Sequence, residues 1–476
     1  MNVENIYSSE FIDEIVQHNV NRNLIRYNLF MKFIMNHSPL LEERDLAISI
    51  YDQSKKIPPG ALAAVFSDPS FSYWIYLSTC ITRRLENGEE IPESDLPYLK
   101  GLANKHLRTP LHFHLIEINR FLFSASMLSR SPMEASINFL EDVFYLPILG
   151  LYFTSGTETT QTFASYKSEE DTFKFKIGDQ QFDQIEKLLF LAERGSSEFI
   201  QEGNAFLQAS ILGNGGKMIL DRVDPFIRFE WSMRYRNPDG SRYLPIGFSE
   251  IKKEVPVVID AFQLIEKYWI EMANHISSTI QVVHLVKSPN PDRHMSCTSL
   301  LFFGSILTST GNELQLSEAL VHEYSHNLLN MVILAGEIFE SQIPQEEIYY
   351  SPWREDPRPI SGVLHAVFVF TNVSELLDRL SVAFPNDIYL NTRRYENFIR
   401  LEMGLMVLRE FSFKKDFANA ILADLESKIQ RLRIAFSLVD LKPYKRTQII
   451  HLKQWIENNG IDNLPISLLN YLVKQE

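Results

Sequence analysis

The stretch LSEALVHEYSHNLLNMVILAG, residues 316–336, contains an HExxH motif on an apolar background. His322 and His326 are four residues apart, so in a helix they lie on one face, about one turn from each other. Two imidazoles in this arrangement can bind a single divalent cation. Glu323 is rotated by about 100° from His322 around the helix axis, so it can border an open coordination position. The motif therefore predicts a metal-binding helix.

A third metal ligand has to come from another part of the chain. The HExxHxxGxxH class of metallopeptidases is excluded, because the matching positions hold Leu329 and Val332. The next predicted helix, SGVLHAVFVFTNVSELLDRL at residues 361–380, contains His365 among apolar residues. We expect His365 to be the third ligand, with Glu375 on the same helix as the alternative. The competing interpretation of His365 is a buried histidine with a purely structural role.

Polar residues are expected to cap both helices. Ser317 precedes the apolar run of the motif helix and is a candidate N-cap, and Gly336 is a candidate C-cap. Ser361 takes the corresponding N-terminal place in the second helix. These caps predict that the motif lies inside one uninterrupted helix.

The loop IYYSPWREDPRPIS, residues 348–361, connects the two predicted helices and contains three prolines. Arg354 and Arg358 are four residues apart, and Asp356 lies between them. A guanidinium group binds a carboxylate through two parallel hydrogen bonds. The loop therefore predicts a site for an anionic ligand beside the metal. The alternative is an ion pair with Asp356 that only fixes the loop.

The segments ALVHEYSHNLL and YYSPWREDPRPISGVLHAVFVF resemble a family of HExxH-motif peptide-modification proteins. Members are described as 2-oxoglutarate-dependent peptide β-hydroxylases associated with ribosomally made, modified peptides. The resemblance covers residues 317–370, and its SPWR, DPRP and SGVLH parts are far more specific than HExxH alone. Ala366 departs from the family, in which we expect glycine at this position.

This resemblance implies iron(II) and 2-oxoglutarate as cofactors, with a precursor peptide and dioxygen as further substrates. It implies that His322, His326 and His365 bind the iron and that Arg354, Arg358 or both bind 2-oxoglutarate. Glu323 would orient bound water or the cosubstrate. Three histidines depart from the two histidines and one carboxylate that are usual for such iron sites. The residues alone support a divalent metal and an anion site.

Two other classes of function remain open. In a zinc metallopeptidase, Glu323 would act as general base for a zinc-bound water. The arginine loop argues against this class, because a hydrolase does not need a carboxylate site beside its metal. A non-catalytic binding protein is the third class, and the complete His-Glu-His set argues against it.

The remaining segments predict an α+β, mainly helical protein with a zincin-like HExxH core. Residues 1–135 form a predicted helical N-terminal region. Residues 136–476 form the predicted metal-binding catalytic domain, which includes the C-terminal helices. Strands are expected at residues 143–153, 172–182 and 298–309, and a hairpin at residues 226–248. The strand at residues 298–309 is expected to offer an edge to the peptide.

Composition restricts the remaining classes. The chain has 476 residues and a formal net charge of −14, which argues against a nucleic-acid partner. Two cysteines, Cys80 and Cys297, exclude a disulfide framework. The polar, acidic start MNVENIYSSEFIDEIV is not a signal peptide. We found no run of about 18 uncharged apolar residues. We therefore expect a cytoplasmic protein with no membrane partner.

Overall fold

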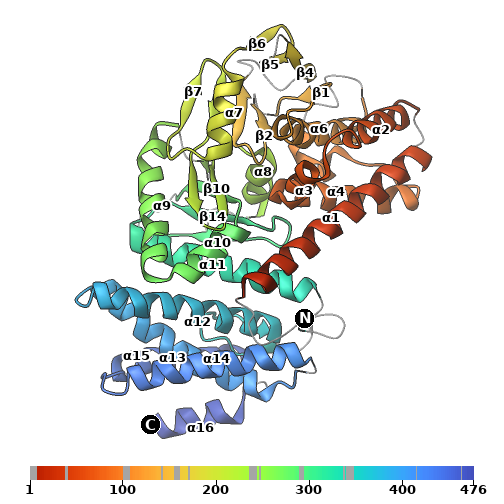
Figure 1. Ribbon diagram of the computed structural model, residues 1–476. Helices are drawn as coiled ribbons and strands as arrows, with labels where there is room; N and C mark the ends of the chain where they lie inside the picture. The colour runs from red at the N-terminus through yellow and green to blue at the C-terminus, as the bar shows by residue number, and fades with distance from the viewer. Residues whose placement is uncertain are drawn as a thin grey trace. The chain divides into compact units, whose positions relative to one another are not determined.

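The structure is a computed structural model (Figure 1). It describes residues 8–37, 41–99, 108–140, 143–154, 161–169, 172–234, 244–245, 248–288, 294–335, 338, 348–413, 415–461 and 464–475.

The chain forms two compact units. Unit 1 consists of the residues up to Ile15, Gln263–Ile276 and the chain from Ser317 onward. Unit 2 consists of Val16–Phe262 and Ser277–Leu316. The predicted boundary near residue 135 falls inside unit 2. All predicted site residues belong to unit 1.

The N-terminal region is helical, as the sequence predicts. Its helices are α1 (Ser9–His37), α2 (Leu41–Ser54), α3 (Pro59–Ser67), α4 (Pro69–Glu86), η2 (Glu93–Asp95), η3 (Pro97–Leu99) and α6 (Pro110–Leu128). Asp68 caps α4 by accepting a hydrogen bond from the Ser70 amide at 2.8 Å. Thr109 caps α6 through the His112 amide at 3.1 Å. Each cap is followed by a proline at the first helical position, which stabilises the start of the helix.

Two antiparallel sheets of four strands each follow in unit 2. The first has the order β1-β4-β5-β6 and the second the order β2-β3-β8-β7. Their strands are β1 (Met133–Asn138), β2 (Val143–Leu146), β3 (Leu151–Thr154), β4 (Gln161–Glu169), β5 (Thr172–Ile177), β6 (Gln180–Phe182), β7 (Ile200–Glu202) and β8 (Ala205–Leu207), with α7 (Ile185–Arg194) between β6 and β7. The predicted strands at residues 143–153 and 172–182 are thus hairpins, β2-β3 and β5-β6.

A mixed sheet in unit 2 has the order β13-β14-β12-β10-β9, with β11 also paired to β12. Its strands are β9 (Ser210–Gly213), β10 (Gly216–Asp221), β11 (Leu244–Pro245), β12 (Val282–Lys287), β13 (Ser296–Cys297) and β14 (Ser305–Ser309). Strand β14 is shorter than the predicted strand at residues 298–309 and lies between β12 and β13. The expected peptide edge is therefore largely occupied by neighbouring strands.

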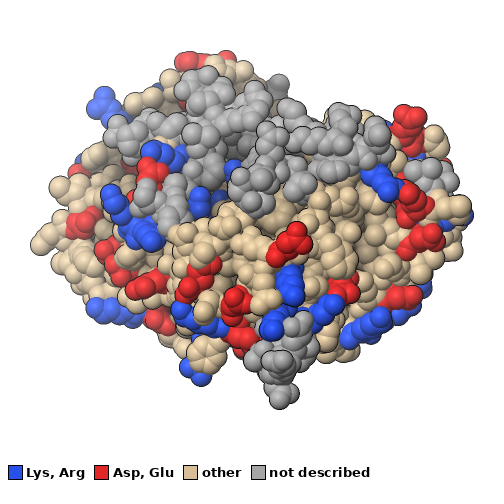
Figure 2. Space-filling model, turned by 90° about the horizontal axis from the view of Figure 1, so that it is seen from above, with Lys and Arg blue, Asp and Glu red and all other residues tan. Residues whose placement is uncertain are grey.

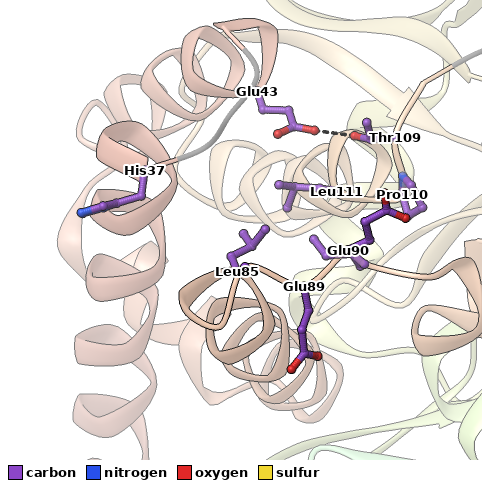
Figure 3. A pocket seen from close by; sticks show the side chains of 10 residues that line it. His37, Glu43, Leu85, Glu89, Glu90, Thr109, Pro110 and Leu111 are labelled. Carbon is purple, nitrogen blue, oxygen red and sulfur yellow. Dashed lines mark hydrogen bonds between the residues drawn. The ribbon is translucent and has the colours of Figure 1, made fainter.

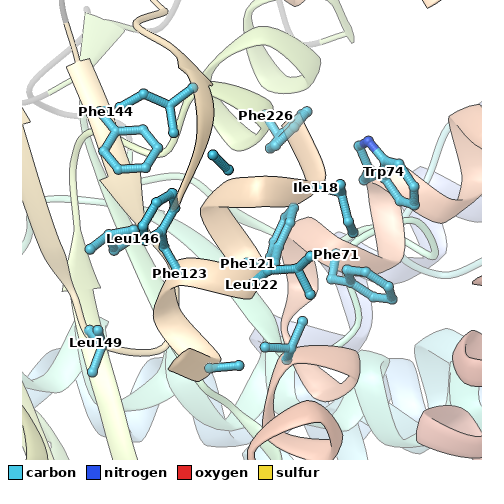
Figure 4. Close-up of a cluster of buried hydrophobic side chains, with 14 of the residues drawn as sticks. Phe71, Trp74, Ile118, Phe121, Leu122, Phe123, Phe144, Leu146, Leu149 and Phe226 are labelled. Carbon is cyan, nitrogen blue, oxygen red and sulfur yellow. The ribbon is translucent and has the colours of Figure 1, made fainter. Parts of the chain in front are cut away.

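Aromatic and aliphatic side chains from α4, α6, α8 (Pro225–Arg234) and strand β2 contribute to the core of unit 2 (Figure 4). Phe121 contacts Phe71 edge to face, with ring centroids 5.3 Å apart. Helix α6 is central to this core, because its residues from Phe113 to Met127 are buried on every side. Such a helix is typical of the interior of a large unit.

The predicted hairpin at residues 226–248 is wrong in its first half, where the structure has helix α8 (Pro225–Arg234). The Asp224 carboxylate accepts hydrogen bonds from the amides of Phe226 at 2.9 Å and Ile227 at 3.3 Å. This cap, together with Pro225 at the start, favours a helix over the strand that the alternating side chains suggest. The predicted turn at residues 237–240 lies outside the described residues.

Helices dominate unit 1, so the prediction of an α+β, mainly helical protein is confirmed. From residue 248 onward, three of them also have residues in unit 2, namely α9 (Phe248–Tyr268), α10 (Ile270–Thr279) and α11 (Glu313–Leu334). The others are α12 (Ile360–Ala383), α13 (Ile388–Glu410), α14 (Asp416–Ala435), α15 (Lys442–Asn459) and α16 (Ile466–Gln475). Helix α12 is long and apolar enough to cross a membrane, but 72% of its most apolar window is buried inside the protein. It is better explained as a core helix.

Candidate metal centre

The HExxH motif lies in the middle of helix α11. Asn312 caps this helix, because its side chain accepts from the Gln315 amide at 2.9 Å while the Gln315 side chain accepts from the Asn312 amide at 3.2 Å. This reciprocal pair is a capping box. Ser317 is therefore not the N-cap but a fully buried residue inside the helix. Gly336, the expected C-cap, lies outside the described residues.

Three histidines from two helices come together in unit 1. His326 on α11 and His365 on α12 face each other, with their Nδ1 atoms 3.2 Å apart. The ring of His322 contacts the ring of His326 at a centroid distance of 4.9 Å. Its Nε2 lies 3.9 Å from the Glu323 carboxylate. The structure thus brings His365 to the motif histidines, as the sequence predicts for a third ligand.

Packing between α11 and α12 determines where His365 lies. The Asn372 side chain donates a hydrogen bond to the Ser325 hydroxyl at 3.0 Å, and both residues are buried. Phe370 contacts His322 edge to face at 5.1 Å. Ser361, the expected cap of α12, lies within its first turn, and Pro359 occupies the N-cap position.

Burial keeps the three imidazoles neutral. It lowers the pKa of His322 to about 4, with a further contribution from the positive charge of Arg393. Burial and the neighbouring histidine lower the pKa of both His326 and His365 to about 3. Neutral imidazoles have a free lone pair, which is the form that binds a metal.

The donor set fits a divalent cation in its chemistry and in part in its geometry. Metal–nitrogen bonds of ~2.0–2.1 Å place two ligand nitrogens about 3.0–3.4 Å apart, and the His326–His365 spacing of 3.2 Å agrees with this. Across the described residues, however, no group of three or more His, Cys, Asp or Glu side chains is arranged to hold a metal ion.

Glu375, the alternative third ligand, is already paired with cations. Its carboxylate bonds to Arg379 at 2.9 Å and lies 3.9 Å from Arg431. A carboxylate that neutralises two arginines is poorly available to a metal. These contacts favour His365 over Glu375.

The loop with the two arginines is closed by a short ladder between β15 (Ile348–Tyr349) and β16 (Arg358–Pro359). Both arginines contact Asp356, Arg354 at 3.5 Å and Arg358 at 2.9 Å. The Arg354 side chain is 59% exposed and the Arg358 side chain 32%. The structure therefore contains the ion pairs of the alternative interpretation, and Arg358 is the better enclosed of the two.

Helix α15 fixes this loop. The Gln448 side chain donates hydrogen bonds to the Pro352 carbonyl at 2.8 Å and to the Tyr350 hydroxyl at 3.1 Å. Tyr350 also bonds to His451 Nδ1 at 3.0 Å. Trp353 stacks on Phe370 at 5.0 Å and so connects the loop to the ring that contacts His322. The loop is thus held against the helices that surround the histidines.

Sequence reasoning missed a third arginine near the histidines. Arg393 on α13 bonds to Glu318, which lies one turn before His322 on α11. Tyr389 donates a hydrogen bond to the same carboxylate at 2.9 Å. Spacing gave a signal, since Arg393, Asn397 and Arg400 are at positions i, i+4 and i+7 and share one helix face.

A cavity of about 570 Å³ lies in unit 2, and no predicted site residue lines it (Figure 3). Glu43, Glu89 and Glu90 line it together with leucine side chains, and Glu43 accepts a hydrogen bond from Thr109. Glu89 forms an ion pair with Arg84 at 2.8 Å.

The face shown in Figure 2 has acidic and basic side chains interspersed over the surface that the structure describes.

The chain matches no known protein-family model and no curated protein sequence. The resemblance to the peptide-modification family therefore rests on the residues of the motif helix, the loop and the start of α12.

Proposed function

We propose that this protein is an iron(II)- and 2-oxoglutarate-dependent oxygenase with a zincin-like core. It would hydroxylate a β-carbon of a residue in a ribosomally made precursor peptide. The observation that carries the proposal is the pair of facing nitrogens on His326 and His365, because it supports a third ligand from α12. The activity itself is taken from the family resemblance.

Each site residue has a role in this proposal. His322, His326 and His365 would hold the iron, which supplies the site for activating dioxygen when bound. Phe370 restricts the His322 ring from one side, and the Asn372–Ser325 bond fixes α12 so that His365 faces α11. Glu323, 2% exposed, would orient a polar group of the cosubstrate from a position shielded from water.

The cosubstrate would be bound through its carboxylate groups. Arg358 is the better loop candidate, because it is less exposed than Arg354 and its stem passes over Gly362, one turn before His365. To bind the cosubstrate, it would exchange Asp356 for the incoming carboxylate. Gln448 bonds to the loop backbone at Pro352 and would keep the loop ordered during this exchange, which limits its cost in conformational entropy.

A zinc metallopeptidase is the second candidate. It is favoured by the pairing of both loop arginines with Asp356, which gives them a structural role without any ligand. It is also favoured by the Glu323 carboxylate beside His322, where a general base for water would lie.

Mass spectrometry of a short peptide encoded beside the gene tests the proposal. With iron(II), 2-oxoglutarate and dioxygen, the peptide should gain one oxygen atom with an intact backbone, and succinate should form. Fragments produced with zinc and without dioxygen would replace the oxygenase with the peptidase. A His326→Ala variant is the matched inactive control for either reaction.

A further inference from the structure

We infer that the outer edge of the Arg393 guanidinium forms a carboxylate-binding site beside His322. The site is separate from the two loop arginines that the sequence predicts. Its ligand class is a carboxylate that reaches the three histidines from the α13 side. The structure supports the site itself, and the identity of the carboxylate rests on the proposed function.

Helices α11 and α13 hold Arg393 in place through Glu318. The Glu318 carboxylate accepts from Arg393 Nε at 3.3 Å and also from Arg393 Nη2. It accepts a third bond from the Tyr389 hydroxyl at 2.9 Å. Because Glu318 precedes His322 by one helical turn, this network fixes the guanidinium at the level of the histidine cluster.

The geometry of these bonds leaves part of the guanidinium available. A guanidinium has five N–H donors, and both bonds to Glu318 use its Nε–Nη2 edge. The Nη1–Nη2 edge can bind a second carboxylate in the same bidentate way. Arg393 can therefore bridge Glu318 and an incoming anion.

Arg393 and His322 are both partly exposed. The Arg393 side chain is 26% exposed, and that of His322 is 23% exposed, so a ligand can reach both.

Glu396, one turn further along α13, is a second acidic group near Arg393. It also lies 3.8 Å from Arg400. The Arg400 Nε donates in turn to Gln448 at 3.4 Å. On this face of α13, Arg393 bonds to Glu318, one turn before His322. Arg400 instead contacts Gln448, which holds the loop.

Two sources could supply the carboxylate. One is the cosubstrate, and the other is an acidic side chain of the peptide substrate. Both sources present a carboxylate to the guanidinium. The titration therefore needs ligands that represent each source by itself. The dicarboxylates 2-oxoglutarate and glutarate represent the first source, and a tripeptide with a central aspartate represents the second.

Calorimetric titration of the metal-free full chain with these ligands is the test. Arg393→Lys retains a charge for Glu318 but loses the planar fork, so it should weaken carboxylate binding about tenfold to a hundredfold. Glu318→Gln frees the inner edge of Arg393 and should leave binding equal or tighter. Arg409→Gln, on an exposed ion pair with Glu426 at the other end of α13, is the matched control and should bind as wild type does.

Folding is monitored by thermal unfolding of each variant. If Arg393→Lys is unstable, the double variant Glu318→Gln with Arg393→Gln removes both charges and leaves no unpaired buried carboxylate.

The ligand that binds identifies the source of the carboxylate. Binding of an aspartate but not an asparagine tripeptide would assign the site to the peptide, and binding of the dicarboxylates would assign it to the cosubstrate. Wild-type protein that binds none of these ligands, or equal affinity in Arg393→Lys, overturns the inference. The oxygen-incorporation assay judges the proposed function separately.

Discussion

At the scale of single residues, His365 is the residue on which the metal centre depends most. We predict that His365→Ala weakens metal affinity more than about a hundredfold, since loss of an outer-shell partner alone costs about 10–100-fold. Metal content after dialysis, measured by mass spectrometry, checks this. Glu375→Ala is the matched control and should retain the metal, because Glu375 is paired with Arg379. The opposite pattern would make Glu375 the third ligand.

Glu323 separates the two reaction classes. A peptidase needs this carboxylate to accept a proton from water, so Glu323→Gln should lower turnover about 10²–10⁴-fold. An oxygenase needs no such proton transfer, so we predict that Glu323→Gln retains measurable succinate formation while His322→Ala has none. Succinate release from 2-oxoglutarate is the measurement. Complete inactivity of a folded, metal-loaded Glu323→Gln protein would argue against the oxygenase.

The sequence was sufficient to place His322 and His326 on one helix face, because their spacing is a local feature. His365 was predicted from its place on the next helix, and the structure brings it to His326. The sequence was not sufficient to find Arg393. That residue is 75 positions away from Glu318, its partner, and only the packing of α13 against α11 brings the two together. The spacing of Arg393, Asn397 and Arg400 marks one helix face, but it does not show which residue that face contacts.

At the scale of elements, Gly404 allows α13 to approach both α12 and the arginine loop. A Cβ atom at this position would lie 2.7 Å from Val367 and 3.1 Å from the Trp353 ring. We predict that Gly404→Ala lowers the free energy of unfolding by about 1–3 kcal/mol, because overpacking forces neighbouring side chains apart. Urea denaturation of the variant measures this.

Gly362 provides the control in the same unit. A Cβ atom there would meet Arg358 at 3.5 Å, which is an ordinary contact. Gly362→Ala should therefore be neutral or gain about 0.5–1 kcal/mol from better helix propensity. A loss of stability as large as that of Gly404→Ala would mean that close packing at Gly404 is not the cause.

Element boundaries differ from the prediction where capping is decisive. Alternating aromatic and polar residues after Pro225 suggest a strand, but the Asp224 cap makes this segment helix α8. The motif helix likewise begins earlier than expected, because Asn312 and Gln315 form the cap in place of Ser317. In both cases, side-chain hydrogen bonds to backbone amides outweigh the hydrophobic pattern.

At the scale of the whole molecule, buried acids predict a pH-dependent stability. Burial and the neighbouring Asp224 raise the pKa of Asp68 to about 8, and burial raises that of Asp224 to about 6. The folded state therefore retains protons that the unfolded chain has released. For each such group, stability should fall by up to about 1.4 kcal/mol per pH unit between the ordinary carboxyl pKa of about 4 and its raised pKa. That upper limit is about 6 for Asp224 and about 8 for Asp68.

Asp68→Asn tests this dependence. The asparagine side chain can still accept from the Ser70 amide, so the cap of α4 is preserved while the titration is removed. We predict that the variant loses less stability than wild type between pH 6 and pH 8, where Asp224 is already ionised and Asp68 still releases its proton. Urea unfolding of both proteins across this range provides the comparison. An unchanged slope would show that Asp68 does not titrate there.

The division into units was the least accessible feature from sequence. Residues up to Ile15 and Gln263–Ile276 belong to the same unit as the metal-binding helices, although they are far from them in the chain. Composition changes near residue 135, where helices give way to strands, yet both parts share one hydrophobic core. The change of secondary structure near residue 135 therefore does not coincide with a division between the two compact units.

Anaerobic titration of iron(II)-loaded protein with 2-oxoglutarate tests the proposed function most directly, because it requires no peptide substrate. Iron and cosubstrate bound together should give a metal-to-ligand charge-transfer band in visible absorption. We predict this band for wild type, its absence in His365→Ala, and its retention in the control Glu375→Ala. A wild-type protein that binds iron(II) but shows no band at any concentration of 2-oxoglutarate would contradict the proposed function.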